Sequence, residues 1–208
     1  MSQFFEIHPD NPQKRLIQQA VEIINKGGVV IYPTDSSYAI GCHLGDKKAV
    51  DKIRMIRQLD KNHNFTIVCR DLSEISQYAV VDSMNYRLLK SLTPGPYTFI
   101  MQASREVPKR LLNPKRKAIG LRVPDNAVCS ALLEELDQPL MSSTLTLPGE
   151  EYPMLDPYQI RLKLEGVVDL IIDGGFCGHE PTTVVNLVDG VPEILRQGLG
   201  ETDWLVQH

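Results

Sequence analysis

Thr182-Thr-Val-Val-Asn-Leu-Val188 and Val191-Pro-Glu-Ile-Leu195 are two runs rich in β-branched residues, and Asp189-Gly190 separates them. An Asp-Gly pair between two such runs is typical of a type I′ hairpin, so this stretch predicts two antiparallel strands. Elsewhere, short apolar runs alternate with segments of helical periodicity, which favours a sheet covered by helices. Because the hairpin adds antiparallel pairing, the sequence predicts an α/β (α+β) fold with a mixed sheet, in a single domain over residues 1–208.

The expected helices and strands follow from local signals. Residues 16–24 have helical spacing, and Gly27-Gly28 closes that helix. Five aspartates precede helical segments and are the expected N-caps: Asp46, Asp71, Asp82, Asp125 and Asp156. The strands expected outside the hairpin are residues 29–32, 65–69, 97–101, 118–123, 139–144 and 168–172.

The composition is that of an ordinary folded protein. Of the 208 residues, 42% are hydrophobic and 23% are charged, which excludes a disordered chain. No apolar run approaches the roughly 20 residues that span a bilayer, and residues 1–10 lack the features of a signal peptide. The four cysteines lie far apart without a Cys-x-x-Cys motif, so we expect neither a zinc site nor a disulfide framework. We therefore expect a cytoplasmic protein that does not bind membranes.

Charge is distributed unevenly along the chain. The formal net charge is −4, yet residues 47–122 hold 16 Lys and Arg against 6 Asp and Glu. Within this block, a basic cluster faces the single acid Glu106: Arg105, Lys109, Arg110, Lys115, Arg116, Lys117 and Arg122. Such a field attracts phosphates or nucleic acid, whereas the alternative is that the block folds against acidic neighbours. Aromatic residues are scarce there, so any RNA is expected to be recognised by its shape and backbone.

The sequence lacks the motifs of several common catalytic sites. It has no P-loop, no dinucleotide-binding motif and no nucleophile elbow. The five histidines show no ligand spacing, which predicts no metal site, and no nucleophile–histidine pair is expected. Hydroxyl-bearing residues instead follow several strands: Thr34, Ser36, Ser37, Ser142, Ser143, Thr144, Thr146, Thr182 and Thr183. Either these hydroxyls converge on a site that binds phosphates, or threonine is simply common in strands.

Six short segments occur in a fixed order along the chain. They are Pro33-Thr-Asp-Ser-Ser-Tyr-Ala-Ile-Gly-Cys42, Pro94-Gly-Pro-Tyr-Thr98, Gly120-Leu-Arg-Val-Pro124, Asp173-Gly-Gly175, Pro181-Thr-Thr-Val-Val185 and Ile194-Leu-Arg-Gln-Gly198. Over about residues 14–200, the chain resembles the YrdC-like threonylcarbamoyl-AMP synthase family, and most closely its YciO branch. The resemblance implies an open, twisted sheet with a basic concave face. It also implies a family whose catalytic members condense threonine, bicarbonate and ATP into threonylcarbamoyl-AMP, an intermediate in tRNA modification.

The resemblance assigns binding roles to individual residues. Thr34 and Tyr38 would line a threonine pocket. Arg122, Thr182 and Arg196 would contact a nucleotide or its phosphates.

Two of the family's motifs are altered in this chain. At the K-x-R motif, Arg57 stands at the lysine, and Leu59 or Asp60 stands at the arginine. At the S-x-N motif, Thr144 keeps a hydroxyl, whereas Thr146 replaces an amide that can both donate and accept. Because one cation aimed at developing negative charge is worth about a hundredfold in rate, we expect the synthase reaction to be weak or lost.

The first functional hypothesis is a YrdC-like protein of RNA metabolism. It would bind double-stranded RNA or tRNA, or ATP or AMP, through a basic cleft. The expected substrate- and nucleotide-binding residues are Thr34, Tyr38, Arg57, Arg122, Thr144, Thr182 and Arg196. The expected RNA-binding residues are Lys109, Arg110, Lys115, Arg116 and Lys117.

The alternative hypothesis is a working threonylcarbamoyl-AMP synthase, a nucleotidyltransferase that uses ATP with Mg²⁺ as substrate. No permanently bound cofactor is expected, and no catalytic residue is assigned. A third hypothesis is a protein-interaction role in which the cleft is vestigial. The sequence does not specify the oligomeric state.

Overall fold

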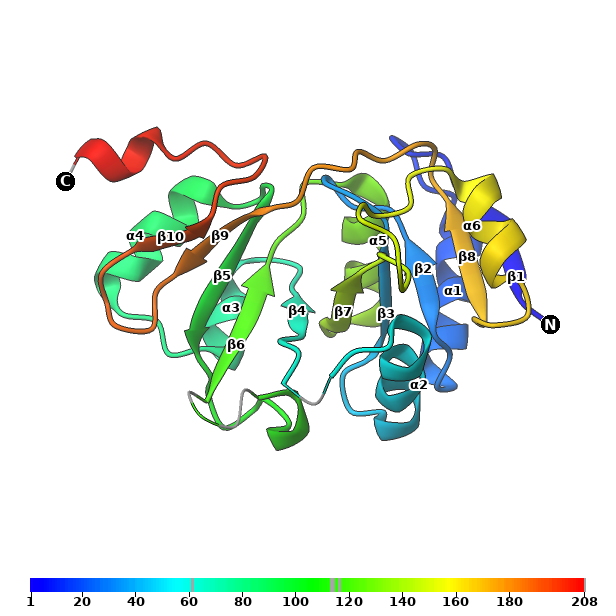
Figure 1. The fold of residues 1–208 in the computed structure, drawn as a ribbon, viewed down its shortest axis with the longest axis horizontal. Helices are drawn as coiled ribbons and strands as arrows, with labels where there is room; N and C mark the ends of the chain where they lie inside the picture. Colours follow the sequence, from blue (N-terminus) through cyan, green and yellow to red (C-terminus); the bar gives the residue numbers. More distant parts are fainter. Residues whose placement is uncertain (61, 113–114, 116, 208) are drawn as a thin grey trace.

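One sheet runs through the whole molecule (Figure 1). The computed structural model describes residues 1–60, 62–112, 115 and 117–207, and within these ranges ten strands are joined in the order β1-β8-β2-β3-β7-β4-β6-β5-β9-β10. The strands are β1 (Gln3–Glu6), β2 (Val30–Tyr32), β3 (Ala39–His43), β4 (Thr66–Val68), β5 (Tyr97–Gln102), β6 (Ala118–Arg122), β7 (Leu140–Thr144), β8 (Leu170–Asp173), β9 (Thr183–Asn186) and β10 (Glu193–Arg196). Parallel and antiparallel pairs both occur, so the predicted α/β fold with an open, mixed sheet is confirmed.

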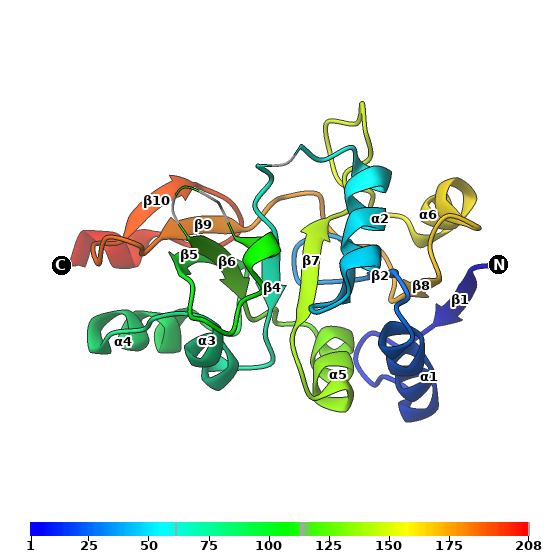
Figure 2. The same ribbon diagram turned by 90° about the horizontal axis from the view of Figure 1, so that it is seen from below.

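Helices lie on both sides of this sheet. They are α1 (Lys14–Asn25), α2 (Lys47–Arg57), α3 (Leu72–Tyr78), α4 (Ser83–Leu92), α5 (Ala127–Leu136) and α6 (Pro157–Leu164), with the short 3₁₀ helices η1 (Lys109–Leu111) and η2 (Asp203–Gln207). Seen from below, α1, α3, α4 and α5 lie on one side of the strands, and α2 and α6 lie on the other (Figure 2). Among the described residues, no helix combines the length and the hydropathy that a membrane crossing requires.

Most helices begin at the predicted N-cap. Asp46, Asp71 and Asp82 each accept a hydrogen bond from the backbone N–H three residues further on. The prediction that Asp125 caps α5 is wrong, because Asn126 accepts the capping hydrogen bond from Cys129 instead. The backbone N–H of Asp125 is engaged by a long-range partner, the carboxylate of Asp35, at 2.8 Å, and the helix begins after it.

The hairpin of residues 182–195 is present, but its turn differs from the prediction. β9 and β10 pair antiparallel, as expected. The two-residue type I′ turn is wrong, because that turn needs positive φ at both central residues and only Gly190 has it, at 80°. The loop is longer, since β9 ends at Asn186 and β10 begins at Glu193, and the backbone N–H of Gly190 donates to the carbonyl of Leu187 at 3.3 Å in a turn inside it.

Two strands were not predicted from the sequence, β1 and β3. β3 is almost wholly buried and has no polar–apolar alternation, while β1 is an edge strand that pairs only with the distant β8.

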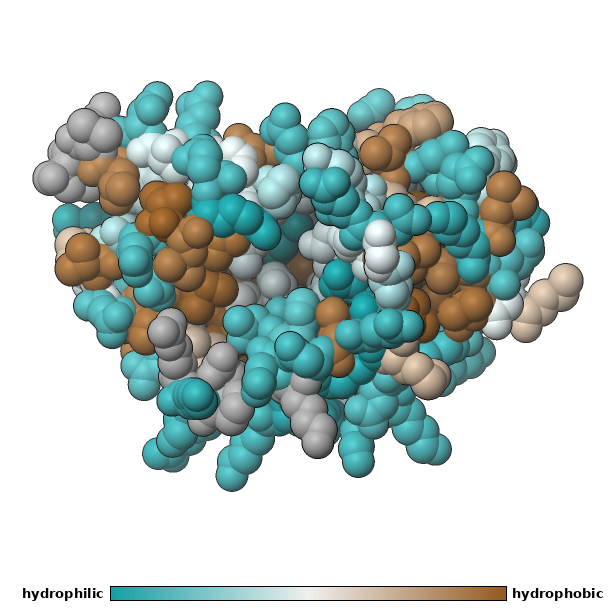
Figure 3. Space-filling view, viewed as in Figure 1, coloured by the Kyte–Doolittle hydropathy of each residue, from teal (hydrophilic) through white to brown (hydrophobic). Residues whose placement is uncertain are grey.

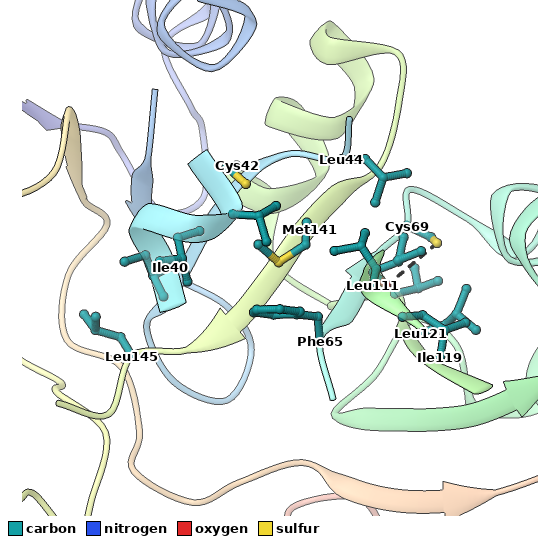
Figure 4. Close-up of a cluster of buried hydrophobic side chains, with 14 of the residues drawn as sticks. Ile40, Cys42, Leu44, Phe65, Cys69, Leu111, Ile119, Leu121, Met141 and Leu145 are labelled. Atoms are coloured by element: carbon teal, nitrogen blue, oxygen red, sulfur yellow. Dashed lines mark hydrogen bonds between the residues drawn. The ribbon is translucent and has the colours of Figure 1, made fainter. Parts of the chain in front are cut away.

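Two apolar clusters fix the sheet against its helices. One packs α1 and α5 onto the strands and contains Ile24, Leu132 and Leu170, each fully buried. The other lies around the central strands, where Phe65 is next to Met141 (Figure 4). Close packing in the two clusters therefore keeps the central strands, which carry the candidate site, in fixed positions.

Candidate functional site

A cleft of about 800 Å³ opens over the middle of the sheet, on the side that carries α2. Five consecutive strands contribute to its floor through Thr66 (β4), Thr98 (β5), Gly120 (β6), Ser142 (β7) and Val184 (β9). A Cβ at position 120 would lie only 3.1 Å from the hydroxyl of Thr66, so glycine keeps the floor clear. The space-filling view shows the hollow near the centre of this face, between two more apolar regions (Figure 3).

Arg122, the last residue of β6, lines the cleft although it is only 8% exposed. Its guanidinium forms an ion pair with Asp35 and lies 3.4 Å from the hydroxyl of Ser36. The second carboxylate oxygen of Asp35 accepts the hydrogen bond from Asp125 described above. Nε of Arg122 is buried and has no hydrogen-bond partner in the part of the chain that the structure describes. The ion pair thus fixes the orientation of the Arg122 guanidinium. Its Nε–H has no acceptor among the residues that the structure describes, and an oxygen atom of a ligand would supply one.

A β-bulge in β10 aims Arg196 into the same cleft. Ile194 pairs with Val185 and Arg196 pairs with Val184, so Leu195 is an extra residue in the strand. In a regular strand, Ile194 and Arg196 would point to the same side. With the bulge, Ile194 shares the side of the buried Val185, and Arg196 shares the side of Val184, which lines the cleft.

Thr182 holds the guanidinium of Arg196 in place. The Nε and Nη2 atoms of Arg196 donate to the carbonyl of Thr182 at 3.1 and 2.9 Å, and Nη2 also lies 3.2 Å from its hydroxyl. That hydroxyl is 2.8 Å from the hydroxyl of Thr98. Burial and the charge of Arg122 both lower the pKa of Arg196. Two cations that repel each other in this way would gain from an anion bound between them.

A third arginine lies on the β7 side of the cleft. Nε of Arg57 donates to the carbonyl of Thr146 at 3.0 Å, and Nη1 donates to the hydroxyl of Ser143. The same hydroxyl lies 3.3 Å from Nε2 of His63. Burial and then the charge of Arg57 lower the pKa of His63, against an opposite effect of Asp60. The sequence predicted no nucleophile–histidine pair, yet folding brings a serine and a histidine that lie 80 positions apart within hydrogen-bond distance.

One rim of the cleft is acidic and aromatic. Glu151, Tyr152, His179 and Glu180 line it, and the rings of Tyr152 and His179 are in T-shaped contact with centroids 5.8 Å apart. The cleft therefore has arginines on its floor and carboxylates at one rim, which suits a ligand that is anionic at one end only. Within the described ranges, no group of three or more His, Cys, Asp or Glu side chains is arranged to hold a metal ion.

Five of the seven predicted substrate- and nucleotide-binding residues line this one cleft. They are Arg57, Arg122, Thr144, Thr182 and Arg196.

Thr34 and Tyr38 are not among the residues that line the cleft. The hydroxyl of Thr34 donates to the carbonyl of Ser37 at 2.6 Å, and that of Tyr38 donates to the carbonyl of Gly175 at 2.6 Å. Both hydroxyls hold turns of the chain in place, and a role of either residue in binding threonine stays a prediction.

The predicted RNA-binding residues lie outside the cleft. Lys109, Arg110, Lys115 and Lys117 are exposed, and Arg116 falls outside the described residues. Arg110 donates to the carbonyl of Gly45, which ties the η1 segment to the start of α2 at the lower edge of the view in Figure 1.

Lys47 and Lys48 are exposed in the first turn of α2. With four exposed cations in and after η1 they make up the set that we call the cationic rim: Lys47, Lys48, Lys109, Arg110, Lys115 and Lys117.

Comparison with known proteins places this architecture in a family. Residues 22–198 match the Sua5/YciO/YrdC family model, which is described as "Telomere recombination". The chain belongs to the Sua5/YciO/YrdC family. A protein described as uncharacterized protein YciO, from Escherichia coli K12, is 57% identical over 201 residues, which cover 97% of this chain and 98% of the relative. An uncharacterized protein of Haemophilus influenzae is 59% identical over 203 residues, with the same coverage.

Solved structures of the Sua5/YciO/YrdC family share the fold. The crystal structure of E. coli YciO superposes with a TM-score of 0.94 at 57% identity, and the match covers 98% of both chains. P. abyssi Sua5, solved in complex with L-threonine, gives a TM-score of 0.86 at 22% identity. That match covers 94% of this chain and 57% of Sua5, and at this identity it shows a shared fold alone.

The altered family motifs fall on the β7 side of the cleft. Arg57, at the lysine of K-x-R, lines the cleft, whereas Leu59 is partly buried against the apolar core. Thr146, at the asparagine of S-x-N, lines the cleft and holds Arg57 through its carbonyl. Arg57 and Thr146 therefore lie at the site, whereas Leu59 does not line it.

The sequence assigned no role to Asp35 and His63, and it marked Ser143 only as one of the hydroxyl-bearing residues that follow strands. Asp35 lies within the first family-like segment, which was a usable signal. His63 lies in a polar loop that carries no motif, and nothing local marks it as a partner of Ser143.

Proposed function

We propose that this protein binds an adenine nucleotide, ATP or AMP, in the cleft and binds RNA along the cationic rim, and that it acts in RNA metabolism. The observation that carries the proposal is the meeting of Arg57, Arg122 and Arg196 in one cleft, although α2, β6 and β10 supply them from distant parts of the chain.

Three features of the cleft support a phosphate-bearing ligand. Guanidinium groups bind phosphate oxygens through several directed hydrogen bonds, and each of these three arginines is already oriented by a protein acceptor. The buried Nε of Arg122 lacks a partner among the described residues. The cleft volume of about 800 Å³ is also within the usual range of about 300–1,000 Å³ for small-molecule sites.

The cationic rim supports RNA as a macromolecular partner. Its six cations come from two segments that the hydrogen bond between Arg110 and Gly45 holds together. Exposed lysines bind backbone phosphates regardless of sequence, which agrees with recognition of double-stranded RNA or tRNA by shape.

Threonylcarbamoyl-AMP synthesis is the second candidate function. It is favoured by Arg122 and Arg196, which stand at retained family motifs and line the cleft. ATP with Mg²⁺ would be a substrate. We expect a low rate, because no guanidinium stands at Leu59 and no amide stands at Thr146.

Calorimetric titration with ATP and AMP, with and without Mg²⁺, tests the nucleotide site. We expect saturable binding that Arg196→Gln weakens about tenfold or more, because charged hydrogen bonds to phosphate are lost. Arg15→Gln is the matched control, since Arg15 is exposed on α1, on the other side of the sheet. If neither nucleotide binds, or if the two variants behave alike, the nucleotide site is refuted.

Filter binding of tRNA and of a double-stranded RNA over a range of salt concentrations tests RNA binding by the cationic rim. Lys109→Gln and Lys117→Gln should each reduce the slope of log K against log salt by about one, whereas Lys14→Gln on α1 should not. A slope near zero for the unmodified protein would remove the phosphate-contact argument.

Pyrophosphate release from ATP in the presence of Mg²⁺, bicarbonate and threonine tests the second candidate. We expect a low rate that rises when Leu59→Arg is combined with Thr146→Asn. Release at background level from both the unmodified protein and this double variant would exclude the synthase.

A further inference from the structure

Two polar side chains, those of His63 and Arg57, contact one oxygen atom on the β7 side of the cleft, the hydroxyl oxygen of Ser143. Ser143 is 7% exposed and lines the cleft, and its Oγ lies 3.3 Å from Nε2 of His63. Arg57 donates a hydrogen bond to the same Oγ. The carbonyl of Thr146 holds Arg57 in this position through a 3.0 Å hydrogen bond from Nε. The hydroxyl therefore stands between a cation and an imidazole, both of which also line the cleft.

The hydrogen-bond chemistry of the three groups determines where the hydroxyl proton lies. A guanidinium can only donate, so Oγ of Ser143 accepts from Arg57, and its own proton is left to be donated to Nε2 of His63 whenever that nitrogen carries no proton. The imidazole is then the tautomer with its proton on Nδ1. Burial of His63, then the charge of Arg57 and that of Arg54 lower the pKa of His63 against an opposite effect of Asp60, and a lowered pKa favours the neutral imidazole. A serine that donates to a neutral imidazole is arranged as an activated nucleophile.

We propose that Ser143 is a catalytic nucleophile, with His63 as its general base, for the hydrolysis of acyl-adenylates, the mixed anhydrides of a carboxylic acid and AMP. The substrate class rests on the proposed nucleotide binding. Ser143 on β7 and Arg122 on β6 both line the cleft, and β4 lies between these two strands in the sheet, so the phosphate would bind at Arg122 on the same floor. An AMP phosphate bound there would place its acyl group toward β7.

The reaction balances with water as the only co-reactant. Oγ of Ser143 forms a bond to the acyl carbon while Nε2 of His63 takes the hydroxyl proton. The bond from that carbon to the phosphate oxygen breaks, AMP leaves with the electron pair, and His63 releases the proton to solvent. His63 then takes a proton from water, whose oxygen attacks the serine ester. The ester bond breaks, and the serine oxygen regains that proton, so the products are the carboxylic acid and AMP.

Labelling with a fluorophosphonate, a probe of activated serines, tests the nucleophile without any substrate. We expect one phosphonyl adduct by intact-protein mass spectrometry, mapped by peptide analysis to Ser143. Ser143→Ala should abolish the adduct, and His63→Gln should slow its formation at least tenfold while the urea midpoint shows that the variant is folded. Ser91→Ala, at an exposed serine on α4, is the matched control and should label normally. No adduct, or an adduct elsewhere, overturns the proposal.

Hydrolysis of acetyl-adenylate tests the reaction itself. AMP release measured by chromatography should exceed the spontaneous rate at least tenfold, and it should fall to the spontaneous rate in Ser143→Ala. AMP titrations on the same samples separate this proposal from the proposed function. AMP binding without labelling or hydrolysis overturns the nucleophile and leaves the nucleotide site standing. Labelling of Ser143 without AMP binding upholds the nucleophile and refutes the nucleotide site.

Discussion

Replacing Arg122 by methionine should destabilise the protein strongly, because it leaves a buried carboxylate without its cation. The side chains of Arg122 and Asp35 are only 10% and 9% exposed. In Arg122→Met, the carboxylate of Asp35 keeps one donor, the backbone N–H of Asp125 at 2.8 Å. Removing one partner of a buried ion pair typically costs about 3–5 kcal/mol, and we expect a loss of unfolding free energy in this range.

Urea denaturation followed by circular dichroism measures this loss. With a slope of about 2–3 kcal/mol per molar urea, the midpoint should fall by about 1–2.5 M. Asp35→Asn, combined with Arg122→Met, should recover part of the loss, because no charge then remains buried. Lys163→Met is the control, since its ion pair with Glu150 is about half exposed, with side chains at 47% and 50%, and should contribute about 1 kcal/mol or less.

Two results would refute this reasoning. If Arg122→Met costs no more than Lys163→Met, Asp35 is not held as a buried ion. If the double variant is less stable than the sum of the two single changes, the side chains are not coupled through a favourable contact.

Three further predictions concern other parts of the site. Gly198→Ala should destabilise by about 1–3 kcal/mol and weaken AMP binding in calorimetry, because its Cβ would lie 2.3 Å from the carbonyl of Pro181, next to the residue that holds Arg196; unchanged values would contradict this. Tyr38→Phe should cost about 1–3 kcal/mol in urea unfolding, because the carbonyl of Gly175 loses its donor, whereas a change in threonine affinity alone would favour a binding role. The pKa of His63 is lower in the folded state, so its stabilising contribution is present above pH 6.5 and is lost on acidification. The unfolding free energy of the unmodified protein should therefore fall more steeply than that of His63→Gln below pH 6.5, and parallel curves would exclude this.

Local signals allowed most helices to be predicted, because capping depends on a few neighbouring residues. Asp46, Asp71 and Asp82 each cap the helix that follows directly. The same rule failed at Asp125, where a carboxylate 90 residues away engages the backbone N–H. Asn126, the next residue, makes the capping bond instead, and the contact that fixes Asp125 comes from a distant segment that a local rule does not contain.

The site was only partly predictable for the same reason. The basic block and the family-like segments indicated Arg122 and Arg196, yet regular strand alternation would place Arg196 on the side of Ile194. Only the bulge at Leu195 turns it into the cleft. The contact between His63 and Ser143 depends on how the loop after α2 passes the end of β7, and no periodicity in the sequence carries that information.

The arginines of the cleft act through their orientation more than through their total charge. Arg122 is paired with Asp35, and two carboxylates, Glu151 and Glu180, line the acidic rim, so the cleft is not a uniformly positive hollow. The electrostatic field of such a mixed set of charges is weak beyond the Debye length of about 8 Å. The guanidinium groups are nevertheless already held in place, so binding a phosphate costs little further side-chain entropy. Selectivity should therefore come from where the donors point, and a ligand should place its phosphate on the floor and keep its uncharged or positive end toward the acidic rim.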